Sequence, residues 1–302
     1  MSAPREEGTG REASKLRRMV CLAAAAANFT RDLDFDLERL RVIIGHARDA
    51  GAAVLAMPDG VLGGYITDLL NPDLDDPATL PPALDPDGPE IRAVIALAGD
   101  MVVCLGYCEG APADALGPVR YNAAVCVSGD GVLGRHRKVH QPVGVAGIFR
   151  AGSSFSAFDT PVGRMGMLID HDKTFPEAAR SLALDGAGII ACLSAWPTSF
   201  TNRAPRKTDD RQTRLFDLYD QARAAENQVV WLSANQSGRS GRLDFLGHAK
   251  IVGPGGDILA RTWAKGGLAI AEVDTGTVIT GARAVLHHLQ ERRPDTYRVL
   301  AP

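Results

Sequence analysis

The sequence predicts an α/β protein in which two sheets pack face to face and helices cover their outer sides, a four-layer α-β-β-α sandwich. Two observations predict this fold. Apolar runs of strand length alternate with longer segments of helical pattern, and the alternation occurs in two similar halves of the chain. The chain has 302 residues, 45% of them hydrophobic, which is enough for a large core.

The first half begins with an apolar run at residues 19–27 that we interpret as a buried strand. The basic residues Lys15, Arg17 and Arg18 in front of it are also typical of a secretory signal, but the alanine-rich run favours the strand. Residues 1–18 are polar and charged and predict a disordered tail. The elements that follow are a helix at 34–50, a strand at 52–57, a Pro- and Asp-rich surface loop at 71–90, a helix at 91–98 and strands at 101–107, 121–127 and 132–136.

The second half repeats this order. A buried strand at 165–169 leads into a helix that begins near Pro176. The remaining predicted elements are a strand at 187–193, a long polar helix at 206–227, and strands near 228–235, 247–256 and 268–273. We divide the chain into the tail at 1–18, one domain at 19–280 and a C-terminal extension at 281–302.

Charge and cysteine content exclude several classes of function. The chain has 33 basic and 36 acidic residues, a net charge of −3, and lacks the clustered positive surface that nucleic acid requires. No run of about 20 apolar residues indicates a membrane span. The five cysteines form no close-spaced pair and most lie in apolar runs, which indicates reduced thiols and a cytoplasmic protein.

The strand at 165–169 ends in three polar residues, Asp170, His171 and Asp172. Because ligands bind at the carboxyl ends of strands in α/β proteins, Asp170 is the first candidate site residue. Adjacent side chains of an extended segment point to opposite faces, so we expect no metal site here. Asp172 is expected to form a local salt-bridge set with Glu177 and Arg180.

This stretch belongs to a longer motif made of Gly163, Arg164, Gly166, Ile169, Asp172, Phe175, Pro176, Glu177 and Arg180, and an earlier motif contains Pro58, Gly64 and Tyr65. The chain also has an Arg-Lys-x-His motif around Lys138 and an Arg-Ala-x-Glu-Asn motif that ends at Asn227. With these motifs the chain resembles the nitrilase superfamily of carbon–nitrogen hydrolases, and the resemblance runs from about residue 19 to 273.

The resemblance implies a catalytic centre with an altered composition. The family's nucleophilic cysteine corresponds to Asp170, its general-base glutamate to Asp59, and its lysine to Lys138, which is retained. The loop at 141–150, where the family has a supporting glutamate, contains no acid. Attack of a carboxylate on an amide would give a mixed anhydride of much higher energy than the amide, so the family's covalent chemistry is disfavoured.

Three interpretations follow. In the first, Asp59, Lys138 and Asp170 form an acid/base centre acting on a small amide- or nitrile-type molecule, by hydrolysis or by a non-hydrolytic step such as cyclisation or group transfer. In the second, Asp170 attacks a saturated carbon and forms an ester. In the third, the protein is non-catalytic and binds a ligand or a partner chain.

Further residues of the expected site are Tyr65, Phe149, His171 and Trp196, which we assign to substrate binding. No cofactor and no metal is expected. By resemblance, the chain forms a homodimer or larger homo-oligomer, to which the C-terminal segment contributes.

Overall fold

The computed structural model describes residues 19–70, 72, 79–115 and 117–297. The predicted tail at 1–18 and part of the predicted loop at 71–90 lie outside these residues. No helix in the described part is long and apolar enough to cross a membrane. Its helices are α1 (Leu33–Asp49), α2 (Pro89–Ala98), α3 (Pro176–Leu184), α4 (Arg211–Asn227) and α5 (Thr275–Val285).

Strands β1 to β7 cover the first half of the chain and enter the second. They are β1 (Val20–Ala27), β2 (Val54–Ala56), β3 (Val102–Asp114), β4 (Gly117–Ser128), β5 (Gly131–Arg137), β6 (Phe158–Thr160) and β7 (Gly163–Ile169). The later strands are β8 (Ile189–Ser194), β9 (Val230–Ser240), β10 (Leu243–Leu246), β11 (Lys250–Val252), β12 (Ile258–Arg261) and β13 (Gly267–Val273).

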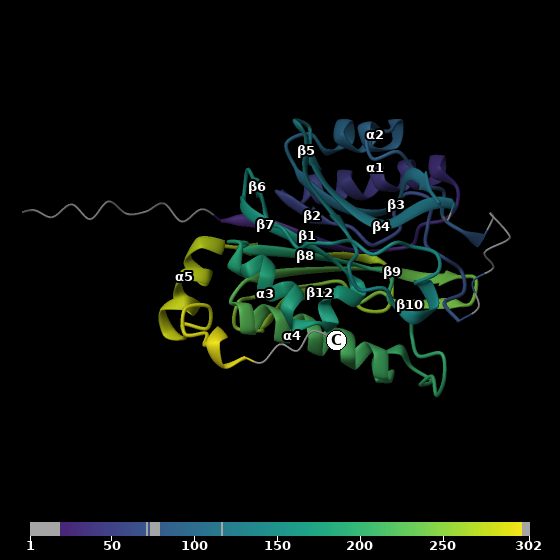
Figure 1. Ribbon diagram of the computed structural model, residues 1–302. Coiled ribbons are helices and arrows are strands. Elements are labelled where there is room, and N and C mark those ends of the chain that lie inside the picture. The colour runs from purple at the N-terminus through teal and green to yellow at the C-terminus, as the bar shows by residue number, and fades with distance from the viewer. Residues whose placement is uncertain (1–18, 71, 73–78, 116, 298–302) are drawn as a thin grey trace, which may run out of the picture.

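Four layers are visible in the fold, as the sequence predicts. Helices α1 and α2 cover one side, α3 and α4 cover the other, and the strands lie between them (Figure 1). The strand order is β5-β4-β3-β2-β1-β9-β8-β7-β6, with β13 antiparallel to β1. Strands β1 and β9 pair through two residues of each strand, Ala26 and Ala27 with Asn235 and Gln236, which joins the two halves.

The alanine-rich strand β1 shows how the layers are built. Ala23, Ala25 and Ala27 pack toward the cluster that contains α1 and α2, whereas Leu22 and Ala24 pack between the sheets. This alternation follows from the two-residue period of a strand. All eight residues of β1 except Cys21 are buried, which confirms the strand interpretation of this run.

Several elements have bounds that differ from the predicted ones, and helix α4 and strand β3 show the physical reasons. Helix α4 begins at Arg211, because a short 3-10 turn at Lys207–Asp209 precedes it and Asp210 caps the helix by accepting a hydrogen bond from the Gln212 amide. Strand β3 continues to Asp114, well beyond the apolar run, because it pairs with β4 along its length.

The fold brings the carboxyl ends of β2, β5, β7 and β8 to one region of the molecule.

Candidate active site

Three charged side chains meet where strands from both halves of the chain end. Asp59 follows β2, Lys138 follows β5 directly, and Asp170 follows β7 directly. All three are almost completely buried, with exposed fractions of 1%, 0% and 6%. The structure therefore brings together the three residues that the sequence analysis selected as a catalytic centre.

Lys138 and Asp170 form a buried ion pair. The Lys138 Nζ donates to Asp170 Oδ1 at 2.6 Å. Burial, the largest single effect, would lower the pKa of Lys138, but the charge and hydrogen bond of Asp170 together with the charges of Tyr65 and Asp59 outweigh it, so the pKa lies above its usual range. Lys138 is therefore a cation at neutral pH.

Asp170 has an unusual backbone conformation. Its φ of 25° lies in the left-handed region, which few residues other than glycine adopt, although aspartate tolerates it better than most. The chain turns here from β7 into a 3-10 segment, Asp170–Thr174, and the His171 amide donates to Asp170 Oδ1. Among the described residues Oδ2 has no hydrogen-bond partner, so it is the oxygen that remains available.

Asp59 is held from several sides. Asn122 Nδ2 donates to its Oδ2 at 2.8 Å, and Gln236 Nε2 donates to its backbone oxygen at 2.8 Å. Burial and the nearby charge of Asp170 raise its pKa to about 7, against the opposing effect of Lys138. A β-carbon at Gly106 would lie 2.7 Å from Asp59 Oδ1, so only glycine leaves room for this carboxyl group. Asp59 changes its charge near neutral pH.

A cavity of about 140 Å³ opens beside Asp170. Its wall contains three of the predicted substrate-binding residues, Tyr65, His171 and Trp196. It also contains residues that the sequence analysis did not select: Leu69, Pro142, Ala195, Pro197, Thr198, Phe200 and Gln212. These lie in loops and at the start of a helix, outside any recognised motif.

Three of the predicted site residues, Asp59, Lys138 and Phe149, do not line the cavity. Asp59 and Phe149 instead border a small tight space together with Asn122 and Tyr65. Tyr65 borders both spaces and so separates the cavity from Asp59. Burial, the largest effect, raises the pKa of the Tyr65 phenol, so its hydroxyl keeps its proton at neutral pH. For His171, burial lowers the pKa, which again favours the neutral form of the side chain.

The predicted salt-bridge set around Asp172 is wrong. Asp172 Oδ2 bonds His136 Nε2 at 3.0 Å, and Oδ1 bonds His140 Nδ1 at 2.9 Å. Burial opposes the ionised form, but these hydrogen bonds outweigh it and hold the pKa of Asp172 below its usual range. Arg180 instead donates to the backbone oxygen of Glu226. The partners come from around β5, which no local pattern could reveal.

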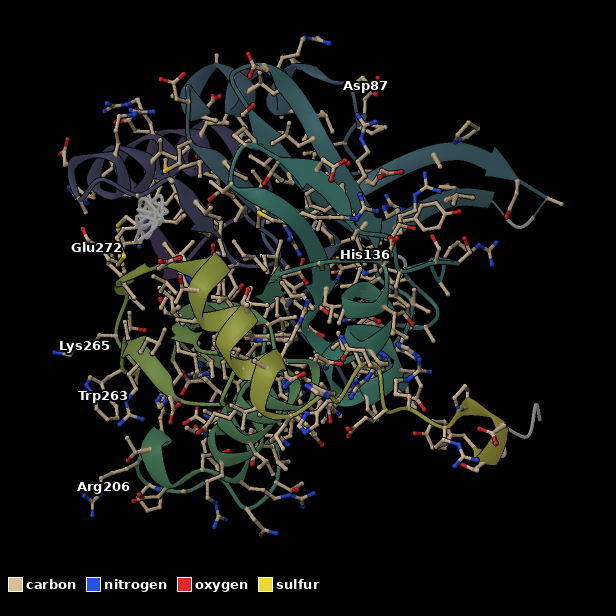
Figure 2. All side chains as sticks on the ribbon, turned by 90° about the vertical axis from the view of Figure 1, so that its left-hand side faces the viewer. Asp87, His136, Arg206, Trp263, Lys265 and Glu272 are labelled. Atoms are coloured by element: carbon tan, nitrogen blue, oxygen red, sulfur yellow. The ribbon has the colours of Figure 1, made fainter. Side chains whose placement is uncertain are left out.

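Asp172 and His136 of this network are buried, and His140 is partly exposed. Figure 2 shows His136 within the fold, whereas residues such as Arg206 and Lys265 lie at the rim. The His140 ring stacks on Phe175 with centroids 3.7 Å apart. Asp172 therefore braces the turn that carries Asp170 against the segment that carries Lys138. Among the described residues no group of three or more His, Cys, Asp or Glu side chains has the arrangement of a metal site.

Comparison with known proteins identifies the family. The carbon-nitrogen hydrolase family matches residues 21–283. The chain belongs to this family. It is 31% identical to the probable nitrilase C965.09 of Schizosaccharomyces pombe over 219 residues, which cover 72% of this chain and 76% of that protein. It is 30% identical to N-carbamoylputrescine amidase of Arabidopsis thaliana over 195 residues, covering 60% of this chain and 63% of the relative.

A solved structure confirms the fold. The carbon-nitrogen hydrolase from Helicobacter pylori G27 matches with a TM-score of 0.80 at 23% identity, covering 93% of this chain and 97% of that chain. The nitrilase-like sandwich predicted from the sequence is therefore the fold of this carbon-nitrogen hydrolase family member.

Proposed function

We propose that this family member acts on a small amide- or nitrile-type molecule by acid/base chemistry in which Asp170 is the reacting group. The observation that carries the proposal is the position of Asp170, which lines the cavity and has one carboxylate oxygen, Oδ2, without a partner among the described residues. No cysteine is among the cavity-lining residues of the described part of the chain. The proposed reaction therefore begins with a carboxylate acting as a base on water rather than with a thiolate nucleophile.

The proposed hydrolysis needs one proton carrier. Asp170 Oδ2 takes a proton from a water molecule while the water oxygen adds to the carbonyl carbon. The same proton then passes to the leaving nitrogen as the carbon–nitrogen bond breaks, which releases an amine or ammonia and a carboxylic acid. Avoiding a covalent acyl-aspartate also avoids the high-energy anhydride.

The neighbouring residues set the charge and geometry of this step. Lys138 balances the Asp170 carboxylate and fixes its Oδ1. Tyr65 lines the cavity and its hydroxyl keeps its proton, so we assign it as the donor for the substrate oxygen. Asp59 does not line the cavity, so its part is electrostatic. When it ionises near pH 7, two carboxylates share the Lys138 charge.

A second candidate is a binding role without turnover. The observation in its favour is that Lys138 is fully buried and paired, so its ammonium does not reach the cavity wall. In that case the charged cluster stabilises the fold and the cavity holds a ligand. A non-hydrolytic acid/base reaction, such as cyclisation or group transfer, would use the same Asp170 oxygen.

The test is release of ammonia or carboxylate from a panel of amides, nitriles and N-carbamoyl compounds, among them N-carbamoylputrescine. We expect turnover by the unchanged chain. In Asp170→Asn the turnover rate should fall by about 100-fold or more, which is roughly the factor that general acid/base catalysis contributes to a rate. Lys138→Ala should lose at least as much. Asp159→Asn is the matched control, because Asp159 is an exposed aspartate that also pairs with a cation, Arg164.

Two outcomes would contradict the proposal. Full activity of Asp170→Asn would remove Asp170 as the reacting group. Absence of turnover across the panel, together with ligand-induced thermal stabilisation of the unchanged chain, would favour the binding role.

We also propose, on the family resemblance, that two or more copies assemble. Helix α5 has no buried residue, and the apolar side chains of its last residue, Val285, and of the next residue, Leu286, are 79% and 55% exposed. Light scattering on the full-length chain tests the assembly, and a monomer at micromolar concentration would contradict it.

A further inference from the structure

We infer that Thr198 and Gln212 form a distal subsite in the cavity that selects a neutral hydrogen-bond-accepting group, such as a ketone or amide carbonyl, carried on an apolar body. Both residues belong to the wall that Asp170 also lines. This inference rests on the proposed function, because the ligand of the subsite is the substrate of the proposed reaction. It adds the chemical class of that substrate.

Thr198 supplies a hydroxyl group that the described part of the protein leaves without a hydrogen-bond partner. The residue is 1% exposed, and its Oγ1 has no hydrogen-bond partner among the described residues. Its backbone is fixed, since the amide donates to the Asp244 oxygen at 2.8 Å. A buried hydroxyl without a partner is costly, and in a cavity wall it is satisfied when a ligand provides the partner.

Gln212 supplies a donor whose orientation is determined by its neighbour. The Trp196 Nε1 donates to Gln212 Oε1 at 3.0 Å. An indole nitrogen can only donate, so the side-chain oxygen of Gln212 must face Trp196 and the Nε2 group must face away from it. Nε2 has no acceptor among the described residues.

Neighbouring residues hold these two side chains in place. The Trp196 amide donates to Asn235 Oδ1 at 2.8 Å, and the Asn235 Nδ2 donates back to the Trp196 oxygen at 3.2 Å. Asp210 Oδ1 accepts from the Gln212 amide and from the Ser199 amide and hydroxyl. The loop after β8 thus presents Thr198, and the first turn of α4 presents Gln212, both from anchored positions, which limits the entropy lost on binding.

The charge of the wall decides the class of ligand group. No lysine or arginine of the described chain lines this cavity, so a distal carboxylate would lack a counter-ion. A distal ammonium would find one acid, Asp170, which already pairs with Lys138. The remaining wall is apolar or aromatic, including Leu69, Trp196 and Phe200. These surroundings fit a neutral acceptor on an apolar or aromatic body.

The test compares two ligands that differ in one acceptor. We would measure the dissociation constants of para-acetylphenylacetamide and phenylacetamide by calorimetry, on the unchanged chain and on Asp170→Asn, which does not consume the ligand. The acetyl compound should bind about tenfold more tightly, the usual value of one to two neutral hydrogen bonds. A para-carboxyl analogue should bind no better than phenylacetamide.

Two near-isosteric variants locate the selectivity. Thr198→Val removes the hydroxyl and keeps the shape of the side chain. Gln212→Glu keeps an acceptor for Trp196 but removes the Nε2 donor. In each variant, the ratio between the dissociation constants of phenylacetamide and para-acetylphenylacetamide should fall to about threefold or less. Thr208→Val, an exposed threonine next to the same helix, is the matched control and should keep the ratio.

The outcomes separate this inference from the proposed function. Equal affinity for the two ligands in the unchanged chain, or an unchanged ratio in both variants, would overturn the subsite even if amides are turned over. Selective binding that depends on both residues would support the subsite even if no amide is turned over, and the proposed hydrolysis would then fail on its own.

Discussion

Two buried clusters of aspartate and lysine lie in this molecule, and they are built from similar contacts. In the first, which we call the open cluster, Lys138 bonds Asp170 at 2.6 Å beside Asp59. In the second, the closed cluster, Lys173 and Lys250 bond the two oxygens of Asp220 at 2.7 and 2.6 Å. All three lysines are fully buried.

The clusters differ in what their carboxylates still offer. Asp220 Oδ1 also accepts from Trp231 Nε1 at 3.0 Å, and both lysine ammonium groups lie over the Phe216 ring, at 3.2 and 4.0 Å from its centroid. Burial opposes the charge of Asp220, but its two lysines outweigh burial and lower its pKa. The closed cluster borders no described part of the cavity. Asp170 does border the cavity, and its Oδ2 has no hydrogen-bond partner in the part of the chain that the structure describes. Burial and pairing alone therefore do not mark a functional site, whereas pairing that leaves one acceptor at a cavity does.

The largest expected effect distinguishes the clusters by stability. Asp220→Asn should lower the free energy of unfolding by about 3–5 kcal/mol, because two buried lysines would lose their shared charge partner. Asp170→Asn should cost about 1–2 kcal/mol, since Asp59 remains beside Lys138 and Asp170 is next to the cavity. Urea denaturation of both variants and the unchanged chain measures the difference. Equal losses would show that access to the cavity does not separate the clusters.

The next prediction concerns pH and the open cluster. The pKa of Asp59 is raised from 3.8 to about 7 in the folded protein. Between these values the unfolded chain is ionised at this residue while the folded protein keeps the proton, so the folded state binds more protons. The contribution of Asp59 to stability is therefore present below the unfolded pKa and is lost as the pH rises through the folded pKa.

Asp59→Asn isolates this contribution. Between about pH 5 and pH 8, the unchanged chain should lose on the order of 2–3 kcal/mol of stability relative to Asp59→Asn. Urea denaturation of both proteins at several pH values gives the two slopes, and effects of other titrating groups cancel in their difference. Parallel pH profiles would mean that Asp59 ionises normally and that the open cluster does not hold a proton near neutrality.

The comparison also shows how far sequence reasoning reaches. The open cluster could be predicted, because Asp59 and Asp170 each follow an apolar strand and because both residues and Lys138 lie in motifs with a recognisable order. The two-sheet fold could be predicted as well, since apolar runs such as β1 and β8 are local properties of the chain. Four elements with weaker patterns, β6, β10, β12 and α5, were not predicted.

The closed cluster could not be predicted from the same sequence. Lys173, Asp220 and Lys250 come from three separate segments, and the helix that carries Asp220 is polar along most of its length. A charged residue in a polar segment is normally solvated, so its burial depends on tertiary packing. The same reason explains why Thr198 and Gln212 were missed. Whether the side chains of Thr198 and Gln212 keep a free hydrogen-bonding group depends on the other segments that pack around them.

The smallest expected effect tests the backbone at Asp170. Its positive φ disfavours residues with a β-carbon, and alanine lacks the polar side chain that eases this conformation. The free energy of unfolding of Asp170→Gly should therefore be about 1 kcal/mol higher than that of Asp170→Ala. In an ordinary helix or strand the order is the reverse, because glycine there is less stable than alanine by a similar amount. Both variants remove the same carboxylate, so the loss of the Lys138 ion pair cancels between them. If the alanine variant were the more stable of the two, the turn after β7 would carry no strain, and the open cluster would differ from the closed one by its access to the cavity alone.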